Sequence, residues 1–244
     1  MEGIMPHSTN VQLSSTLKGY AAHPKGEGPF PGVVVMMEAF GITGHIQGVC
    51  GRLAKSGFAA AAPDIFHGDV IGYTDMDKVK TKIPTLRDNQ ILQEIGETLD
   101  WFSSQKNVNS NRLGIIGFCM GGRFAFFANC RYPDKLKAAV GFYGGGIAPD
   151  GADRFGRMPP INEAEKMRAP LYLGYGADDA SIPPAEHARI AERLSTLKKR
   201  YTLAVYPDAG HGFLCEQRAS YAPAAAEPAW QESLAFLHTN LDRT

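Results

Sequence analysis

Cys119 is a residue whose type and setting could do chemistry. It lies in GIIGFCMGGRFAFFA, which begins as an apolar strand pattern and ends as an apolar helix pattern, and Gly117 and Gly121 flank it. In a G-x-C-x-G turn between a strand and a helix, the glycines leave room for a sharp corner that exposes the central side chain. The helix N-terminus favours negative charge on sulfur. Cys119 is therefore a candidate nucleophile, whereas a lone cysteine in an apolar stretch is usually a small buried hydrophobic residue.

A base and a carboxylate suited to such a thiol follow it in the chain. A thiol that attacks an acyl group needs a base that manages protons and an acid that orients this base. Asp178 and Asp179 end the apolar run LYLGYGADD, and His211 stands between two glycines in YPDAGHGF. The order nucleophile, acid, histidine is typical of enzymes with this turn. We therefore predict a Cys-His-Asp triad, in which either aspartate could serve; the alternative for His211 is a solvent-facing loop residue.

Glu38 is a fourth candidate. It closes the apolar run VVVMME, where a charge is costly unless it is paired or used. A salt bridge or a solvated strand end would account for it. Near a catalytic thiol, Glu38 could instead hold the thiol proton, because a like charge disfavours ionisation of the thiol. Oxidation of the thiol would then also be slowed.

The composition excludes several classes of protein. The 244 residues carry 25 Lys plus Arg and 25 Asp plus Glu, so no overall field favours nucleic acid or anionic lipid. We see neither a signal-peptide pattern nor an apolar run long enough for a membrane helix, and we expect a cytoplasmic protein. The four cysteines show neither metal-site spacing nor the density of a disulfide framework, so structural zinc and disulfides are not expected.

The elements that position these residues alternate between strand and helix patterns. We expect one domain over residues 1–244, with a mainly parallel sheet and helices on both faces, and a ligand site at the carboxyl ends of the strands. Residues 146–166, rich in Gly and Pro, are interpreted as an irregular loop over these ends. The expected strands are 31–41, 58–66, 111–119, 136–145, 169–179 and 201–210 after a hairpin at 10–24, and the expected helices are 45–58, 85–105, 121–133, 183–199 and 223–241.

Taken together in order, the motifs MEAFG, PDIF, GFCMGG, GADDASIP and DAGHGF resemble those of the dienelactone hydrolase family of α/β-hydrolases. The resemblance covers about residues 15–240. The family pattern G-x-x-D-x-x-[IV]-P fits Gly176, Asp179, Ile182 and Pro183, and so selects Asp179 over Asp178. The resemblance implies an α/β-hydrolase fold and an acyl-enzyme mechanism, without metal or organic cofactor, on a small-molecule ester or lactone.

The resemblance also implies a role for each matching position. Cys119 is similar to the family nucleophile, His211 to its general base and acid, and Asp179 to the partner that orients the histidine. Glu38 resembles the residue that takes the thiol proton when substrate displaces it. The backbone N–H groups of Ala39 and Met120, which follow Glu38 and Cys119, would form the oxyanion hole.

Some positions depart from the family pattern or are weakly assigned. Family members that open dienelactones hold the substrate carboxylate with arginines, one of them four residues after the catalytic histidine, and here that position is Cys215. Arg218 lies nearby and is a candidate pocket residue, as is Tyr143 in GFYGGG, with a surface position and core packing as the alternatives. Arg87 is left unassigned. Hydrolysis of dienelactone itself is therefore less supported than hydrolysis of esters, lactones or thioesters as a class.

Two other functions remain open on the sequence. The same residues could transfer an acyl group to an acceptor other than water. A noncatalytic, redox-sensing protein would need a second thiol close to Cys119; Cys130, three helical turns away, is too distant, but Cys50 and Cys215 are not excluded. The sequence predicts neither the physiological substrate nor the oligomeric state.

Overall fold

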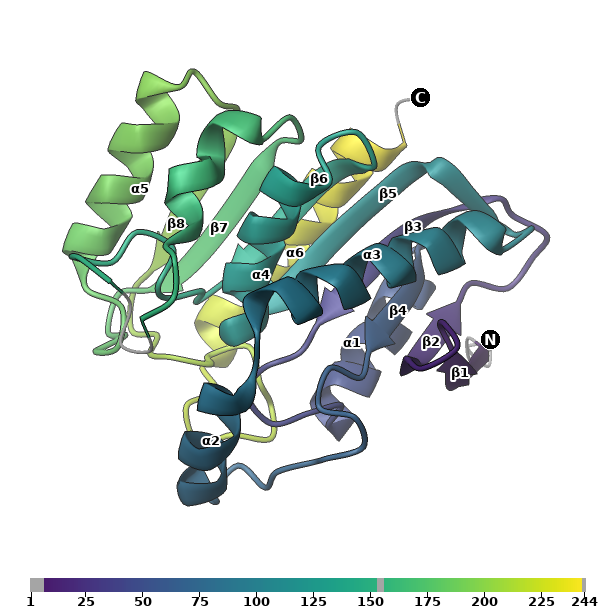
Figure 1. The fold of residues 1–244 in the computed structure, drawn as a ribbon, viewed down its shortest axis with the longest axis horizontal. Coiled ribbons are helices and arrows are strands. Elements are labelled where there is room, and N and C mark those ends of the chain that lie inside the picture. The colour runs from purple at the N-terminus through teal and green to yellow at the C-terminus, as the bar shows by residue number, and fades with distance from the viewer. Residues whose placement is uncertain (1–6, 153–155, 243–244) are drawn as a thin grey trace.

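Eight strands form one sheet in the computed structural model, which describes residues 7–152 and 156–242 (Figure 1). The order across the sheet is β1-β2-β4-β3-β5-β6-β7-β8. The β1–β2 and β2–β4 pairs are antiparallel, and all the other pairs are parallel. The strands are β1 (His7–Gln12), β2 (Lys18–His23), β3 (Phe30–Met36), β4 (Ala59–Pro63), β5 (Val108–Phe118), β6 (Leu136–Phe142), β7 (Leu171–Gly176) and β8 (Tyr201–Tyr206).

Helices cover both faces of this sheet. Figure 1 shows α3 and α4 in front of it and α6 behind it. Within the described part of the chain, we find no helix with both the length and the apolar character needed to cross a membrane. The helices are α1 (Gly44–Lys55), α2 (Met76–Lys82), η1 (Ile83–Thr85), α3 (Asp88–Ser104), α4 (Met120–Arg131), η2 (Pro160–Lys166), α5 (Pro184–Thr196) and α6 (Pro223–Leu241), where η marks a 3₁₀ helix.

The central strands are buried on both faces. Val33, Val34 and Val35 of β3 are fully buried, and in the parallel register Val34 pairs with Ile115 of β5. Continuous β-branched runs of this kind are typical of parallel sheets that helices cover on both sides. The mainly parallel α/β architecture predicted from the sequence is confirmed.

Three details differ from the sequence-based expectation. The short helix α2 was not predicted, because Val79 is its one buried residue and the helix therefore has no apolar stripe. Its N-terminus is capped by the Asp75 side chain, which accepts a hydrogen bond from the Lys78 N–H. The expected loop at 146–166 ends in the 3₁₀ helix η2, and its residues 153–155 lie outside the described residues. Strand β3 ends at Met36, so Glu38 stands in the following loop and not on the strand.

Candidate active site

Cys119 occupies the corner between β5 and α4. Its backbone has φ 55° and ψ −119°, a conformation that costs a residue with a side chain about 1–3 kcal/mol. A hydrogen bond of 2.9 Å from the Cys119 N–H to the Phe142 carbonyl oxygen stabilises this corner. A Cβ on Gly117 would lie 2.0 Å from the Gly121 carbonyl oxygen, and one on Gly121 would lie 2.3 Å from the Met36 carbonyl oxygen. Both glycines are therefore required by close backbone contacts.

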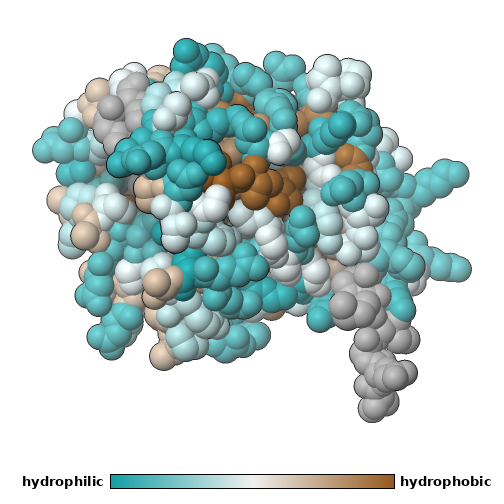
Figure 2. Space-filling model, turned by 90° about the horizontal axis from the view of Figure 1, so that it is seen from below, coloured by the Kyte–Doolittle hydropathy of each residue, from teal (hydrophilic) through white to brown (hydrophobic). Residues whose placement is uncertain are grey.

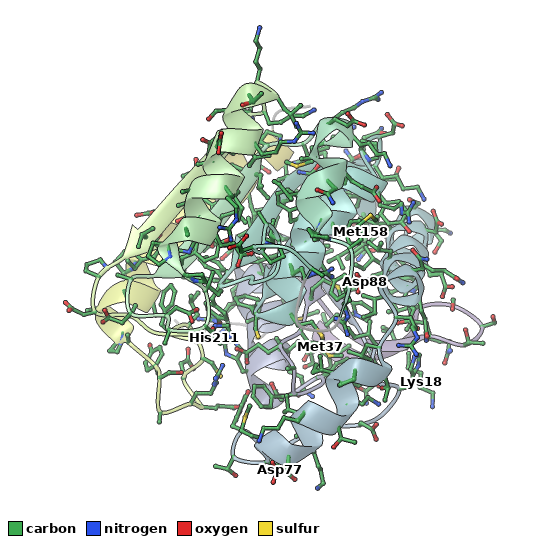
Figure 3. The ribbon with its side chains drawn as sticks, turned by 60° about the vertical axis from the view of Figure 1, so that its left-hand side comes forward. Lys18, Met37, Asp77, Asp88, Met158 and His211 are labelled. Atoms are coloured by element: carbon green, nitrogen blue, oxygen red, sulfur yellow. The ribbon has the colours of Figure 1, made fainter. Side chains whose placement is uncertain are left out.

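His211 links Cys119 to Asp179. Its Nε2 lies 3.0 Å from Sγ of Cys119, and its Nδ1 lies 2.7 Å from Oδ2 of Asp179. The three side chains come from the ends of β5, β7 and β8, which the parallel topology brings to one edge of the sheet. Figure 3 shows His211 at the same end of the molecule as Met37, which follows β3. The geometry is that of a nucleophile, a base and an orienting carboxylate.

Burial distinguishes Asp178 from Asp179, the two candidates for the carboxylate that orients His211. Asp179 is buried and bonds to the imidazole, whereas Asp178 is exposed. Ser181, which sequence reasoning missed, fixes the second carboxylate oxygen: its hydroxyl and its N–H donate to Oδ1 of Asp179 over 2.5 and 2.9 Å. The Ser181 hydroxyl also lies 3.1 Å from Nδ1 of His211. A serine two residues after the acid is the signal that could have identified it, because short-range serine–aspartate bonds are common in turns.

The charges of these groups are coupled. Burial lowers the pKa of His211, but the Cys119 charge and the hydrogen bonds to Asp179 and Cys119 outweigh it and raise the pKa from 6.5 to about 10. Burial raises the pKa of Asp179, yet its bonds with His211 and Ser181 leave this pKa below its ordinary value. The site therefore favours a protonated imidazole beside the carboxylate of Asp179.

Glu38 is paired with Arg218. The carboxylate is buried, and its Oε1 accepts a bond of 3.2 Å from Nη1 of Arg218. Burial raises the pKa of Glu38, and the Arg218 charge opposes this rise. The position of Arg218 depends on Gly212, because a Cβ there would lie 2.1 Å from the Arg218 Nη1. The structure thus brings Arg218 into the site, where its guanidinium also lies over the Phe40 ring.

A cavity of about 440 Å³ lies over Cys119. The two residues expected to form the oxyanion hole, Ala39 and Met120, line it together with Cys119 and His211. Met120 is the first residue of α4, so its N–H has no acceptor within the helix and can donate to a bound oxygen. The cavity is also lined by apolar and by charged side chains. The apolar ones include Phe40, Met76, Val79, Ile83 and Ile182, and the charged ones are Arg123, Arg157, Glu186 and Arg218.

The outer surface near this helix is partly apolar. Figure 2, seen from the end to which α2 projects in Figure 1, shows a hydrophobic patch on an otherwise mostly hydrophilic face. Met76 on α2 and Val70 just before it are among the exposed large hydrophobic residues. Met76 is both exposed and part of the cavity lining, so this helix gives the cavity an apolar rim.

Three expectations about neighbouring residues need correction or completion. Tyr143 does not line the cavity: it is fully buried, and its ring packs edge-on against His211 with the ring centres 5.2 Å apart. Arg87 is exposed, bonds to the Pro84 carbonyl and lies outside this cavity. Cys215, at the expected arginine position, is buried as a free thiol, and burial raises its pKa.

Arg123 is a further residue that sequence reasoning missed. It is buried on α4 and lines the cavity, and it is held by a bond of 2.8 Å to Asp88. The available signal was an arginine in the apolar run GGRFAFFA, since arginine is rarely buried unless it is paired.

Comparison with known proteins places this geometry in context. Residues 17–241 match the model of the dienelactone hydrolase family. A Synechocystis protein provisionally named carboxymethylenebutenolidase is 35% identical over 244 residues, covering 95% of this chain and 94% of the relative. A Bradyrhizobium protein provisionally named 2-oxo-3-(5-oxofuran-2-ylidene)propanoate lactonase is 32% identical over 225 residues, covering 91% and 89%.

The solved structures agree with these sequence matches. The crystal structure of a Klebsiella pneumoniae protein, provisionally titled a dienelactone hydrolase, superposes with a TM-score of 0.87 at 31% identity. The match covers 95% of this chain and 98% of that one. An α/β-hydrolase from a deep-sea metagenome has a TM-score of 0.73 at 13% identity, which supports the α/β-hydrolase fold alone.

Proposed function

The chain belongs to the dienelactone hydrolase family, and from this premise we propose that it hydrolyses small carboxylic esters or lactones through an acyl-enzyme on Cys119. The observation that carries the proposal is the series of hydrogen bonds from Cys119 through His211 to Asp179 beneath the cavity. A sulfur nucleophile, a base and a fixed carboxylate at one cavity are the parts that acyl transfer requires.

In the first half of the reaction, the Cys119 sulfur attacks the carbonyl carbon and the carbonyl oxygen gains negative charge. The N–H groups of Ala39 and Met120 stabilise this charge, which develops only in the transition state. The protonated His211 then gives its proton to the leaving alkoxide as the C–O bond breaks. With a lactone, this alkoxide stays attached to the acyl chain, so the ring opens.

In the second half, His211 takes a proton from a water molecule, which attacks the thioester carbonyl. The C–S bond breaks, the carboxylic acid leaves and the thiolate of Cys119 returns. Asp179 keeps the imidazole oriented with Nδ1 toward its carboxylate through both halves, and Ser181 fixes the carboxylate.

Glu38 would take the proton of the Cys119 thiol when substrate binds and return it to the sulfur after the acid has left. Two observations support this role: burial raises the pKa of Glu38, which favours its protonated form, and its Oε2 is buried without a hydrogen-bond partner among the described residues. In this structure Glu38 accepts a hydrogen bond from Arg218, and the Cys119 sulfur lies 3.0 Å from Nε2 of His211, where a thiolate would be stabilised once Glu38 has taken the proton.

The cavity supports a proposal for the substrate class. Its volume of about 440 Å³ suits a small molecule, and Arg123 and Arg218 on its wall would favour a negatively charged group. The Bradyrhizobium relative is named for a lactone that carries a carboxylate, and we extend this class of substrate to the present chain.

The decisive experiment compares Cys119→Ala with wild type on p-nitrophenyl acetate and on a panel of lactones. We expect turnover to fall by at least about 10³-fold, with an unchanged far-UV circular dichroism spectrum. Cys130→Ala, which removes a buried thiol of α4 that does not line the cavity, is the matched control and should keep its activity. Mass spectrometry of rapidly quenched wild type should find the acyl group on Cys119. Undiminished turnover by Cys119→Ala would refute the proposal.

A further inference from the structure

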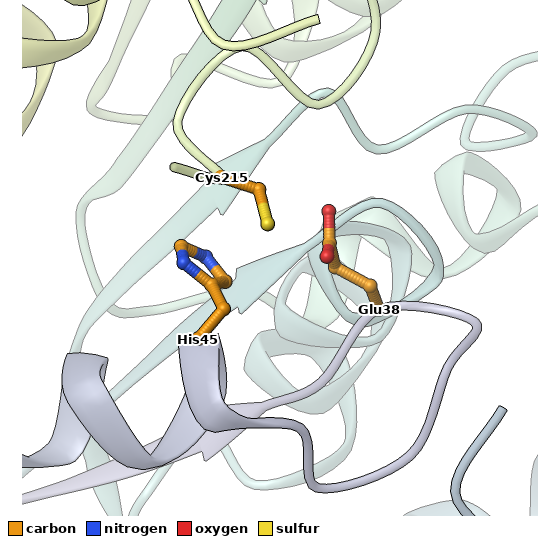
Figure 4. Close-up of side chains that lie close together, drawn as sticks. All are labelled: Glu38, His45 and Cys215. Carbon is orange, nitrogen blue, oxygen red and sulfur yellow. The ribbon is translucent and has the colours of Figure 1, made fainter. Parts of the chain in front are cut away.

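Glu38, His45 and Cys215 form a compact cluster of possible metal ligands (Figure 4). A carboxylate oxygen, a ring nitrogen and the sulfur all lie within 4.8 Å of one another, and all three residues are buried. We propose that this cluster binds a zinc-like divalent cation and that binding inhibits the enzyme by holding Glu38.

Three separate segments supply the cluster. Glu38 lies in the loop after β3, His45 in the first turn of α1, and Cys215 in the loop that follows His211. The Cys215 N–H donates to the Gly212 carbonyl over 3.0 Å, which fixes the direction of this loop close to the catalytic histidine. The spacing in the chain therefore gives no metal-binding motif, and the donors converge only in the folded protein.

Two of the atoms in this cluster that could bind a metal have no hydrogen-bond partner among the described residues. They are Oε2 of Glu38 and Nε2 of His45. Buried polar atoms nearly always have a partner, because leaving one unpaired costs about 1–3 kcal/mol. The Arg218 guanidinium donates to Oε1 of Glu38, and the nearby Tyr143 hydroxyl also acts on this carboxylate. Two unpaired donors at one buried point indicate a site for an electron-pair acceptor.

The types of donor select the metal. Thiolate, imidazole and carboxylate are the ligands of zinc, at about 2.0–2.3 Å, and three protein ligands leave the fourth tetrahedral position open. These bond lengths imply separations of about 3.3–3.8 Å between ligand atoms, so the side chains must approach one another slightly. The carboxylate and the thiolate together balance the charge of a divalent cation. This balance offsets the repulsion that the cation would meet from the positive charges of Arg52 and Arg218, which act on His45.

Binding changes the protonation of the cluster and the freedom of Glu38. The sulfur–metal bond replaces the S–H bond of Cys215, whose proton passes to solvent. A carboxylate held by the metal cannot take the proton of Cys119. The inhibition therefore rests on the proposed role of Glu38, whereas the binding of the metal does not.

Cobalt absorption tests the binding independently of catalysis. Cys119→Ala protein is titrated with Co²⁺, and a thiolate-to-cobalt charge-transfer band in the near ultraviolet is expected with one equivalent bound. Starting from Cys119→Ala excludes a signal from the catalytic thiol. Adding Cys215→Ser should remove the band, and adding His45→Gln should weaken binding by at least about tenfold.

Matched controls are available in the chain. Nε2 of His187 is also buried and lacks a hydrogen-bond partner within residues 7–152 and 156–242, but it lies on α5, so His187→Gln should leave the cobalt titration unchanged. Cys130→Ser is the corresponding thiol control. Failure of the Cys119→Ala protein to give the band, or a band that survives Cys215→Ser, overturns the site.

Inhibition is measured separately on the active enzyme. Zn²⁺ should inhibit ester turnover by wild type, and His45→Gln should relieve this inhibition at the same metal concentration. Metal binding without inhibition would support the site and overturn the effect assigned to Glu38. Because the cobalt titration uses a variant without the catalytic thiol, its outcome does not depend on whether the proposed hydrolysis is correct.

Discussion

The guanidinium of Arg218 reaches the buried carboxylate of Glu38, 3.2 Å away and 180 positions apart in the chain. It passes through space that exists because residue 212 has no side chain. Arg218 lines the same cavity as Cys119 and His211, and His211 is hydrogen-bonded to Asp179.

Gly212→Ala should lower turnover by displacing Arg218. The added Cβ would lie 2.1 Å from Nη1, and the backbone at φ 80° also disfavours a side chain. Because the Arg218 charge opposes the rise in the pKa of Glu38, its displacement should raise this pKa further. Gly210→Ala is the control, since the nearest atom to its Cβ would be 3.8 Å away.

Ester kinetics measure the loss of turnover in Gly212→Ala. The Arg218→Met variant tests whether this loss is caused by displacement of the Arg218 guanidinium. If it is, the Gly212→Ala/Arg218→Met double variant should be no slower than the slower single variant. Additive losses would contradict this account of Gly212.

Asp179→Asn should reduce kcat by up to about 10⁴-fold, because an amide cannot stabilise a protonated His211 and can favour the wrong tautomer. Asp178→Asn makes the same change at an exposed neighbour and should have little effect. Steady-state kinetics on p-nitrophenyl acetate compare the two variants. Equal losses in both, or a loss only in Asp178→Asn, would reverse the assignment of the acid.

His211 should titrate near pH 10 in the folded protein, not near 6.5. Since folding raises this pKa, the stability that the protonated imidazole contributes is fully present below pH 6.5 and is lost as the pH rises toward 10. In Cys119→Ala the charge and hydrogen-bond contributions of Cys119 are absent, so the pKa of His211 should fall. Nitrogen NMR of the imidazole across this range measures both values. An identical midpoint in the two proteins would exclude coupling to Cys119.

Gly121→Ala should destabilise the fold by about 1–3 kcal/mol, because its Cβ would lie 2.3 Å from the Met36 carbonyl oxygen. Gly48→Ala is the opposite control: this residue of α1 is exposed, and beyond its own helix backbone an added Cβ would have no neighbour within 4 Å among the described residues. Removing a helical glycine there should stabilise by about 0.5–1 kcal/mol. Urea unfolding gives both free energies, and a Gly121→Ala protein as stable as wild type would mean that the corner is looser than described.

The sequence by itself determined the alternation of strands and helices, the corner around Cys119 and the set of residues that could serve it. These features are local: apolar periodicity and the glycines flanking a turn are written in neighbouring positions. The family resemblance and the α/β-hydrolase fold predicted from the motifs are confirmed. The helix α2 was missed for a local reason, because it buries a single residue and leaves no periodic pattern.

Only the tertiary structure decided which side chains face the cavity and which pack behind it. It turned Tyr143 into the core behind His211, brought Arg218 to Glu38, and gathered Glu38, His45 and Cys215 from three segments. Such contacts depend on how loops far apart in the chain close over the strand ends. No local pattern encodes that closure, because the packing of the whole sheet and its helices fixes it.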